Sequence, residues 1–203
     1  DPLEWWEAVK KSIQKALQEA GLQGRDIAGI GFSGQMHGMV ALDENKQLAC
    51  NAIIHLDQRS SVDLKEIRAL AGDLMTEELL NQPSAGMMIS SLYWLKKHQK
   101  ETYDRIRYVM SPKDYISFRL CGEISTEYTD AGAALGFSVK NYHWCTELFK
   151  RLDLKEDIWP SVHKSYEIAG HVTAKAAEET GLSTSTKVIC GAGDSMAALT
   201  GNG

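Results

Sequence analysis

Two short apolar segments, 26–32 and 187–190, constrain the fold most, because each runs directly into glycine and polar residues. The first leads into Ser33-Gly34, and the second leads into 191–193 and then Asp194. A short apolar run bounded by glycine is typical of a strand that is buried in the interior of a sheet. The sequence therefore predicts two buried strands, one early and one late in the chain.

The residues between these strands predict mostly helices. Apolar residues from Trp6 to Ala20 recur every three or four positions, which predicts a helix that ends at Gly21. Ser111 followed by Pro112 is typical of a helix start, because proline is favoured at the first helical position. The chain is therefore predicted to be mixed α/β, with strands early and late and helices between them. Other predicted elements are hairpin strands over 38–42 and 48–56, a tight turn at 191–193, and helices over 60–72, 76–80, 84–100, 144–152, 173–180 and 194–199.

Composition excludes several classes of function. Lys and Arg total 22 against 27 Asp and Glu, a net charge of −5, which disfavours a surface for nucleic acid or anionic membrane. No apolar run approaches the ~18 residues of a membrane span. The cysteines form no C-x-x-C pair, which favours reduced thiols in the cytoplasm over a disulfide framework or a metal site. These cysteines are Cys50, Cys121, Cys145 and Cys190.

The segment from Ser33 to Gly38, with the sequence S-G-Q-M-H-G, directly follows the first predicted strand. Its two glycines permit unusual backbone angles and close approach of a ligand. Gln35 and His37 can then present hydrogen-bond donors and acceptors to a sugar or polyol. The alternative is a simple hairpin crossover whose histidine bonds to a neighbouring group.

Asp57 and Arg59 form a second candidate cluster, between a predicted strand and a predicted helix. They are two residues apart, so both side chains point the same way from an extended chain. A carboxylate accepts hydrogen bonds and a guanidinium donates them, which suits the recognition of hydroxyl groups. The alternative is a local cap with a surface ion pair, and the local sequence favours it.

Asp194 is the third candidate, because it follows a strand and a glycine turn and opens a helix. The helix dipole favours an ionised carboxylate at this position, and such a carboxylate suits a general base that takes a proton from an alcohol. One alternative is an ordinary N-cap. Another is a dinucleotide-binding loop, but Met196 stands where G-x-G-x-x-G requires its third glycine.

Taken in order along the chain, these segments and three others resemble the FGGY family of carbohydrate kinases, most closely its xylulokinases. The resemblance covers essentially all 203 residues. The matching motifs are Ser33 to Gly38, His55-Leu56-Asp57-Gln58-Arg59, Pro112-Lys113-Asp114-Tyr115, Gly122-Glu123, Thr129-Asp130-Ala131 and Gly191-Ala192-Gly193-Asp194.

The resemblance implies the actin-like ATPase fold, which is related to ribonuclease H, with a mixed sheet and flanking helices. Members of this family have two lobes, and sugar and ATP meet between them. The resemblance makes Asp194 the catalytic base. The sugar-binding residues that it implies are Gln35, Met36, His37, Asp57, Arg59 and Ser195.

The activity implied is ATP-dependent phosphorylation of a ketopentose, D-xylulose to D-xylulose 5-phosphate, with Mg²⁺ accompanying ATP. Asp194 would deprotonate the terminal hydroxyl, which attacks the γ-phosphate in line. His55 and Leu56 replace the Trp and Asn usual in xylulokinases. Gluconate, ribulose or a polyol therefore stays open as the substrate, and so does a non-catalytic sugar-binding scaffold.

Family members carry a phosphate-binding loop on strands upstream and a nucleotide-binding lobe downstream of the matched region. Neither is recognisable in residues 1–203. We therefore expect a partial N-terminal kinase domain that has no kinase activity by itself. We also expect self-association, for example as a homodimer, through an uncovered sheet edge.

Overall fold

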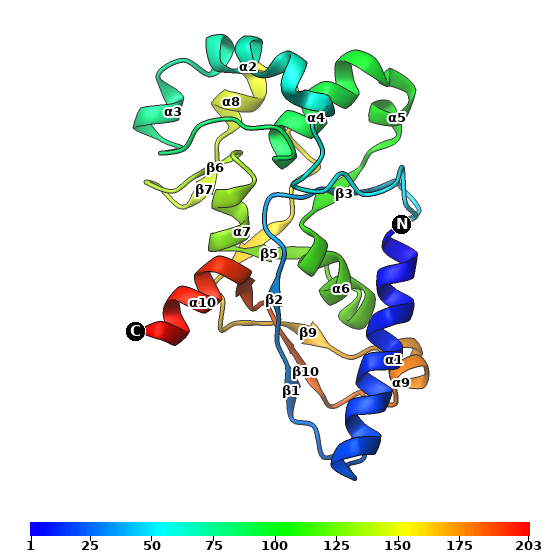
Figure 1. Ribbon diagram of the computed structural model, residues 1–203. Coiled ribbons are helices and arrows are strands. Elements are labelled where there is room, and N and C mark those ends of the chain that lie inside the picture. The colour runs from blue at the N-terminus through cyan, green and yellow to red at the C-terminus, as the bar shows by residue number, and fades with distance from the viewer.

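A three-stranded mixed sheet occupies one half of the computed structural model, which describes residues 1–203 (Figure 1). Its order is β1 (Gly29–Ile30), β10 (Lys187–Ile189) and β9 (Ile168–His171). Strand β1 runs parallel to β10, and β9 runs antiparallel to it. The early and late apolar segments therefore form strands that pair with each other, but the early strand is not buried as predicted, since Gly29 is exposed and Ile30 is half-buried.

Helices α1 (Pro2–Ala20), α6 (Pro112–Cys121) and α9 (Ala174–Thr180) pack together beside this sheet. The first predicted helix is confirmed, because Gly21 closes α1 in the left-handed conformation with φ 65°. Apolar side chains between these helices and the sheet form a small core. Its buried members are Trp6, Leu120, Cys121, Val172, Ala176, Leu182 and Val188.

The other half of the molecule is mainly helical and contains a larger core of 25 buried residues (Figure 1). Short strands form three further pairs: β3 with β4, β5 with β8, and β6 with β7. The helical elements are η1 (Arg59–Asp63), α2 (Leu64–Ala71), α3 (Leu74–Glu77), α4 (Met88–His98), α5 (Lys100–Arg105) and α8 (Thr146–Arg151). The strands are β3 (Val40–Leu42), β4 (Tyr108–Met110), β5 (Ser125–Glu127), β6 (Phe137–Ser138), β7 (His143–Trp144) and β8 (Ser161–His163).

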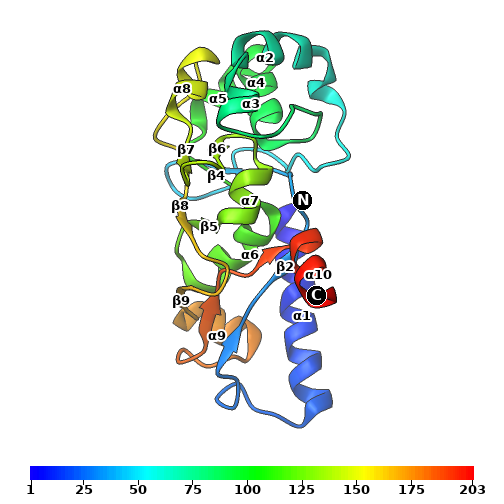
Figure 2. The same ribbon diagram turned by 90° about the vertical axis from the view of Figure 1, so that its left-hand side faces the viewer.

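Between the two halves, β2 (Ser33–Gly34) pairs in parallel with β11 (Ala192–Gly193). Helix α10 (Asp194–Asn202) follows β11 without a gap, and α7 (Tyr128–Ala133) contacts β11. Figure 2 shows β2, α7 and α10 near the middle of the elongated molecule. Because parallel strands end at the same edge, the loop after β2 and the start of α10 lie together.

Several local predictions were wrong. Segment 48–56 is not a continuous strand, and only the isolated bridges at Leu48 and Ile53 remain of it. Residues 191–193 are not a free turn, because β11 pairs with a strand about 160 residues earlier in the chain. Tertiary pairing thus overrode the local turn signal of the glycines. The helix predicted over 84–100 begins only at Met88 and is followed by a separate helix, α5.

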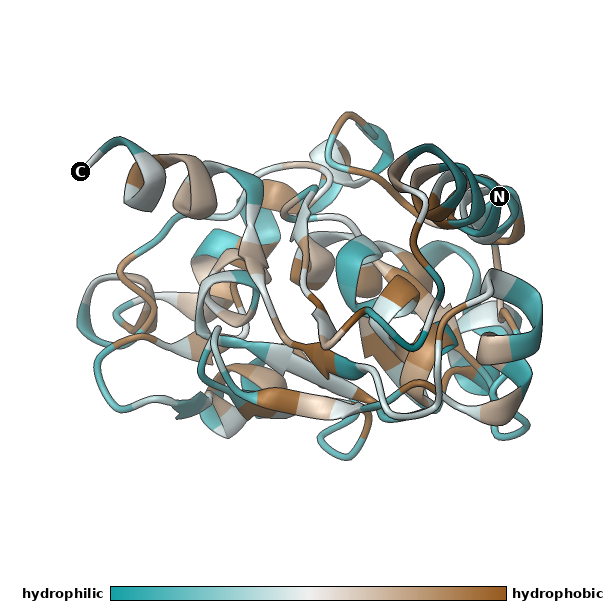
Figure 3. Cartoon of the chain, turned by 90° about the horizontal axis from the view of Figure 1, so that it is seen from below, coloured by the Kyte–Doolittle hydropathy of each residue, from teal (hydrophilic) through white to brown (hydrophobic).

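Apolar residues gather on the central strands in Figure 3, whereas peripheral loops carry more polar residues. No helix has the length and apolar character that crossing a membrane requires.

Candidate functional site

The pairing of β2 with β11 brings the loop after Gly34 against the start of α10. Ser33 is opposite Ala192, and Gly34 is opposite Gly193. The Met36 side chain lies directly over Gly193, where an added Cβ would come within 2.5 Å of the Met36 Cγ. Only glycine therefore leaves room for Met36 beside the residue that precedes Asp194.

His37 is held in an unusual backbone conformation in the same loop. Its φ is 71°, a region that residues with a side chain seldom occupy. The imidazole Nδ1 lies 2.9 Å from the carbonyl oxygen of Ala133, at the end of α7. Since a carbonyl only accepts, Nδ1 carries the proton and Nε2 presents its lone pair. No protein group bonds to Nε2, which is therefore available to a hydroxyl.

Asp194 is exposed and is the first residue of α10, with Gly193 as the N-cap. Its Oδ1 accepts hydrogen bonds from the backbone N–H of Ser195 at 2.6 Å and from the Ser195 hydroxyl at 3.3 Å. Its Oδ2 has no protein partner. The carboxylate is thus fixed through one oxygen, and the other is free to accept a proton or a hydrogen bond.

Gln35 belongs to the same loop, but its amide nitrogen is turned inward. The Nε2 atom is buried and has no hydrogen-bond partner. An added Cβ on Gly38 would lie 2.9 Å from it, so Gln35 packs closely against that glycine. The structure places Gln35 in the candidate site without directing its amide donor toward solvent.

Asp57 and Arg59 are not joined by hydrogen bonds to the other candidate residues. The Arg59 guanidinium donates to Asp57 Oδ2 at 2.8 Å, and the Arg59 backbone N–H donates to Asp57 Oδ1 at 2.9 Å. These bonds to Arg59 lower the pKa of Asp57. Arg59 also lies over the Trp94 ring, 5.2 Å from its centroid. The geometry is that of the local cap and ion pair which the sequence offered as the alternative.

A buried ionic cluster lies beneath the loop and β11, and reasoning from the residues themselves missed it. Lys113, in the first turn of α6, donates to Asp114 at 2.6 Å and to the backbone carbonyl of Cys190 at 3.3 Å. Its ammonium is also 3.2 Å from Asp130 and 3.5 Å from Glu127. The Lys113 side chain is 1% exposed. One cation is therefore enclosed by three carboxylates next to the strand that leads to the site.

Glu127 connects this cluster to Asp194 through Thr129. The Glu127 carboxylate caps α7 by accepting from the backbone N–H groups of Thr129 and Asp130. It also accepts from the Thr129 hydroxyl at 2.7 Å. That hydroxyl oxygen accepts in turn from the Gly193 backbone N–H at 2.9 Å. Glu127 and Thr129 thereby fix the residue that immediately precedes Asp194.

Burial dominates the electrostatics of the cluster. It raises the pKa of Asp130 to about 7, helped by the neighbouring charge of Asp114. Burial also raises the pKa of Asp114, against the attraction of Lys113. For Lys113, burial lowers the pKa, but Asp114 and Asp130 outweigh it and hold the pKa above its usual value. Lys113 therefore stays protonated, and the carboxylates around it compensate for the burial of its charge.

Residues 1–201 match the model of the FGGY family of carbohydrate kinases, N-terminal domain. The chain belongs to the FGGY family of carbohydrate kinases. The xylulose kinase of Staphylococcus epidermidis is 34% identical over 203 residues, which are 100% of this chain and 40% of that protein. This FGGY chain spans about two fifths of the length of the curated relatives that it matches.

Solved FGGY structures agree with the fold. The crystal structure of xylulose kinase from Rhodospirillum rubrum superposes with a TM-score of 0.92 at 25% identity, covering 100% of this chain and 42% of that one. The crystal structure of gluconate kinase from Lactobacillus acidophilus gives a TM-score of 0.86 at 26% identity, covering 96% and 39%. The predicted actin-like ATPase architecture, a mixed sheet with flanking helices, is confirmed.

The residues of this FGGY chain do not complete a metal site by themselves. No group of three His, Cys, Asp or Glu side chains is arranged to hold a metal ion. The three clustered carboxylates already surround the Lys113 ammonium.

Proposed function

We propose that the whole protein transfers the γ-phosphoryl group of ATP to the terminal hydroxyl of a ketopentose, with D-xylulose as the substrate. The observation that carries this proposal is the pairing of β2 with β11, which packs Met36 against Gly193, directly before Asp194, in the loop that also carries His37. Its chemical class rests on membership of the FGGY family. The choice of D-xylulose rests on relatives named as xylulose kinases.

Asp194 acts as the general base in this proposal. Its unpartnered Oδ2 accepts the proton of the sugar's terminal O–H, while Oδ1 stays bonded to Ser195. The oxygen so activated forms the new bond to the γ-phosphorus, and the bond from phosphorus to the bridging oxygen breaks, releasing ADP. Phosphoryl transfer depends chiefly on positioning and charge stabilisation, so the fixed orientation of Asp194 is its main contribution.

The loop after β2 orients the sugar. His37 Nε2 can accept a hydrogen bond from a sugar hydroxyl, because its Nδ1–H is committed to Ala133. Met36 supplies an apolar contact against the carbon backbone next to Gly193. We propose Gln35, Ser195, Asp57 and Arg59 as further sugar contacts. Mg²⁺ accompanies ATP in this proposal and is held by groups outside the cluster. The free cysteines fit the cytoplasm as the location.

The experiment is a coupled assay of ADP formation by the whole protein with D-xylulose, D-ribulose, D-gluconate and glycerol. We expect D-xylulose to give the highest kcat/KM. Asp194→Ala should lower kcat by about 10²- to 10⁴-fold, the usual contribution of acid–base catalysis. Thr200→Ala, a control on the same helix, should leave kcat within about twofold, since the exposed Thr200 hydroxyl bonds only to the carbonyl oxygen of Met196.

The panel of four substrates also distinguishes between the alternative functions. A higher kcat/KM with D-gluconate would replace D-xylulose, and the gluconate kinase neighbour makes this the second candidate. If Asp194→Ala turns over at the wild-type rate, Asp194 is not the base. If the wild type binds a sugar but phosphorylates none of the four, the protein is a non-catalytic sugar-binding scaffold.

A further inference from the structure

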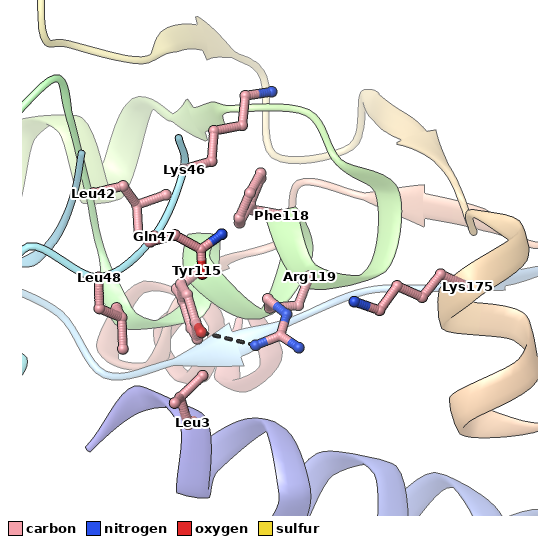
Figure 4. A pocket seen from close by; sticks show the side chains of 9 residues that line it. All are labelled: Leu3, Leu42, Lys46, Gln47, Leu48, Tyr115, Phe118, Arg119 and Lys175. Carbon is pink, nitrogen blue, oxygen red and sulfur yellow. Dashed lines mark hydrogen bonds between the residues drawn. The ribbon is translucent and has the colours of Figure 1, made fainter. Parts of the chain in front are cut away.

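A cationic pocket of about 510 Å³ lies on the far side of α6 from the ionic cluster. It is formed by the start of α1, the hairpin after β3, the second half of α6 and the start of α9 (Figure 4). None of the candidate kinase residues lines it. Its lining residues are Leu3, Leu42, Lys46, Gln47, Leu48, Tyr115, Phe118, Arg119 and Lys175.

Three cations line this pocket, and none of them has a carboxylate partner. Lys46, Arg119 and Lys175 form no salt bridge, and no Asp or Glu is among the lining residues. The acid Glu7 feels the charge of Arg119, but its carboxylate pairs with Lys10 at 2.6 Å. The whole chain carries a net charge of −5, so an acid-free concavity with three cations opposes the average charge of the protein. Such a concavity concentrates anions.

Arg119 is held in place before any ligand arrives. Its guanidinium lies 4.9 Å from the Trp6 ring centroid and 5.8 Å from that of Tyr115. One nitrogen donates to the Tyr115 hydroxyl at 2.9 Å, the dashed line in Figure 4. The other guanidinium N–H groups have no protein acceptor. A pre-oriented guanidinium with free donors matches the oxygens of a phosphate group.

The pocket offers more than a bare anion needs, because five of its nine lining residues are hydrophobic. Leu3, Leu48 and the Phe118 ring belong to this apolar part of the wall (Figure 4). In Figure 4 the Lys175 ammonium extends toward the Arg119 guanidinium, which sets two cations at one end. A volume of about 510 Å³ accommodates a small organic ligand.

We propose that this pocket binds a nucleoside-sized organic phosphate. The phosphate lies between Arg119 and Lys175, and the flat or apolar part of the ligand lies on Phe118 and the leucines. Lys46, whose ammonium is 5.8 Å from the Phe118 ring centroid, closes the open side. The site is separate from Asp194, and its occupancy does not depend on the proposed kinase activity.

The test is isothermal titration calorimetry of the protein with adenosine 5′-monophosphate, and with inorganic phosphate and adenosine as separate ligands. We expect saturable binding of the nucleotide with a Kd below about 1 mM. Inorganic phosphate and adenosine should each bind at least about tenfold more weakly, because each reaches only one part of the pocket. Affinity should fall as salt is raised.

Two variants locate the binding. Arg119→Met and Lys175→Met should each weaken nucleotide binding at least about fivefold. Lys175 is exposed, so its variant keeps the test decisive if Arg119→Met folds poorly. Lys100→Met, an exposed lysine outside the pocket, and Asp194→Ala should leave the affinity unchanged. The proposal is overturned if the nucleotide does not bind saturably, or if the Arg119 and Lys175 variants both bind it with the affinity of the wild type. Loss of binding in Asp194→Ala would also overturn it.

Discussion

Helix α6 carries one cation near each end, Lys113 in its first turn and Arg119 in its last, and their surroundings differ in kind. Lys113 is 1% exposed and is enclosed by three carboxylates. Arg119 is half-buried, lies between two aromatic rings and has no carboxylate partner. A fully buried cation requires compensating acids, so its charge is neutralised within the protein. A half-buried guanidinium held by aromatic rings keeps N–H donors free to bind a ligand.

Because of this contrast, the two cations should contribute unequally to the free energy of unfolding. Lys113→Met should lower the free energy of unfolding by roughly 3 to 5 kcal/mol, because it leaves Asp114, Glu127 and Asp130 buried without a cation. Equilibrium unfolding in urea measures the change. Lys100→Met is the matched control, since Lys100 pairs with Asp104 at the surface, 75% exposed; its effect should stay below about 1 kcal/mol. An equal loss in both variants would mean that the cluster is not a buried ionic unit.

The excess of carboxylates in the cluster predicts a dependence on pH. Burial raises the pKa of Asp130 from 3.8 to about 7, so between these values the folded protein holds a proton that the unfolded chain has released. Stability contributed by this group therefore falls as the pH rises from 4 to 7. Asp130→Asn should match the wild type near pH 5 and exceed its free energy of unfolding by roughly 2 to 3 kcal/mol near pH 8.

The control for the pH experiment is Asp153→Asn. Asp153 pairs with Lys96 at the surface, and this bond lowers its pKa, so it is ionised at both pH 5 and pH 8. Its variant should differ from the wild type by the same amount at the two pH values. A pH-independent difference in Asp130→Asn would show that Asp130 is ionised throughout and paired with Lys113.

The smallest effect is expected at the other end of the helix. Arg119→Met should lower the free energy of unfolding by about 1 kcal/mol or less, the usual value of a cation–π contact together with one neutral acceptor. Urea unfolding under the conditions used for Lys113→Met gives the direct comparison. A loss as large as that of Lys113→Met would make Arg119 a structural cation and would remove the distinction between the ends of α6.

Much of the fold follows from local signals in the sequence. Gly21 ends α1, and Ser111-Pro112 opens α6, because capping depends on residues within one turn. The strand at 192–193 could not be predicted, since its partner lies far away in the sequence. The first and third motifs pointed to His37 and Asp194, and the family resemblance added Met36, which packs against Gly193, directly before Asp194. Asp57 and Arg59 instead satisfy each other.

The ionic cluster was hidden for a related reason. Lys113, Asp114, Glu127 and Asp130 are charged residues, and charged residues are usually exposed. Nothing in their local sequence indicates that three elements, α6, β5 and α7, converge on one buried point. The one available signal was the presence of Pro112 to Tyr115 and Thr129 to Ala131 among the family motifs, which marked these positions without explaining them.

The pairing of Ser33-Gly34 with Ala192-Gly193 also determines at what stage of folding the candidate site forms. The β2 half of the site is synthesised about 160 residues before the β11 half. Contacts between such distant residues form late, because the entropy of closing the intervening loop opposes them until the rest of the chain has packed. The residues proposed to hold the sugar therefore meet the proposed base only near the end of folding. A chain that stalls before this step would keep most of its helices and the larger core while lacking a site.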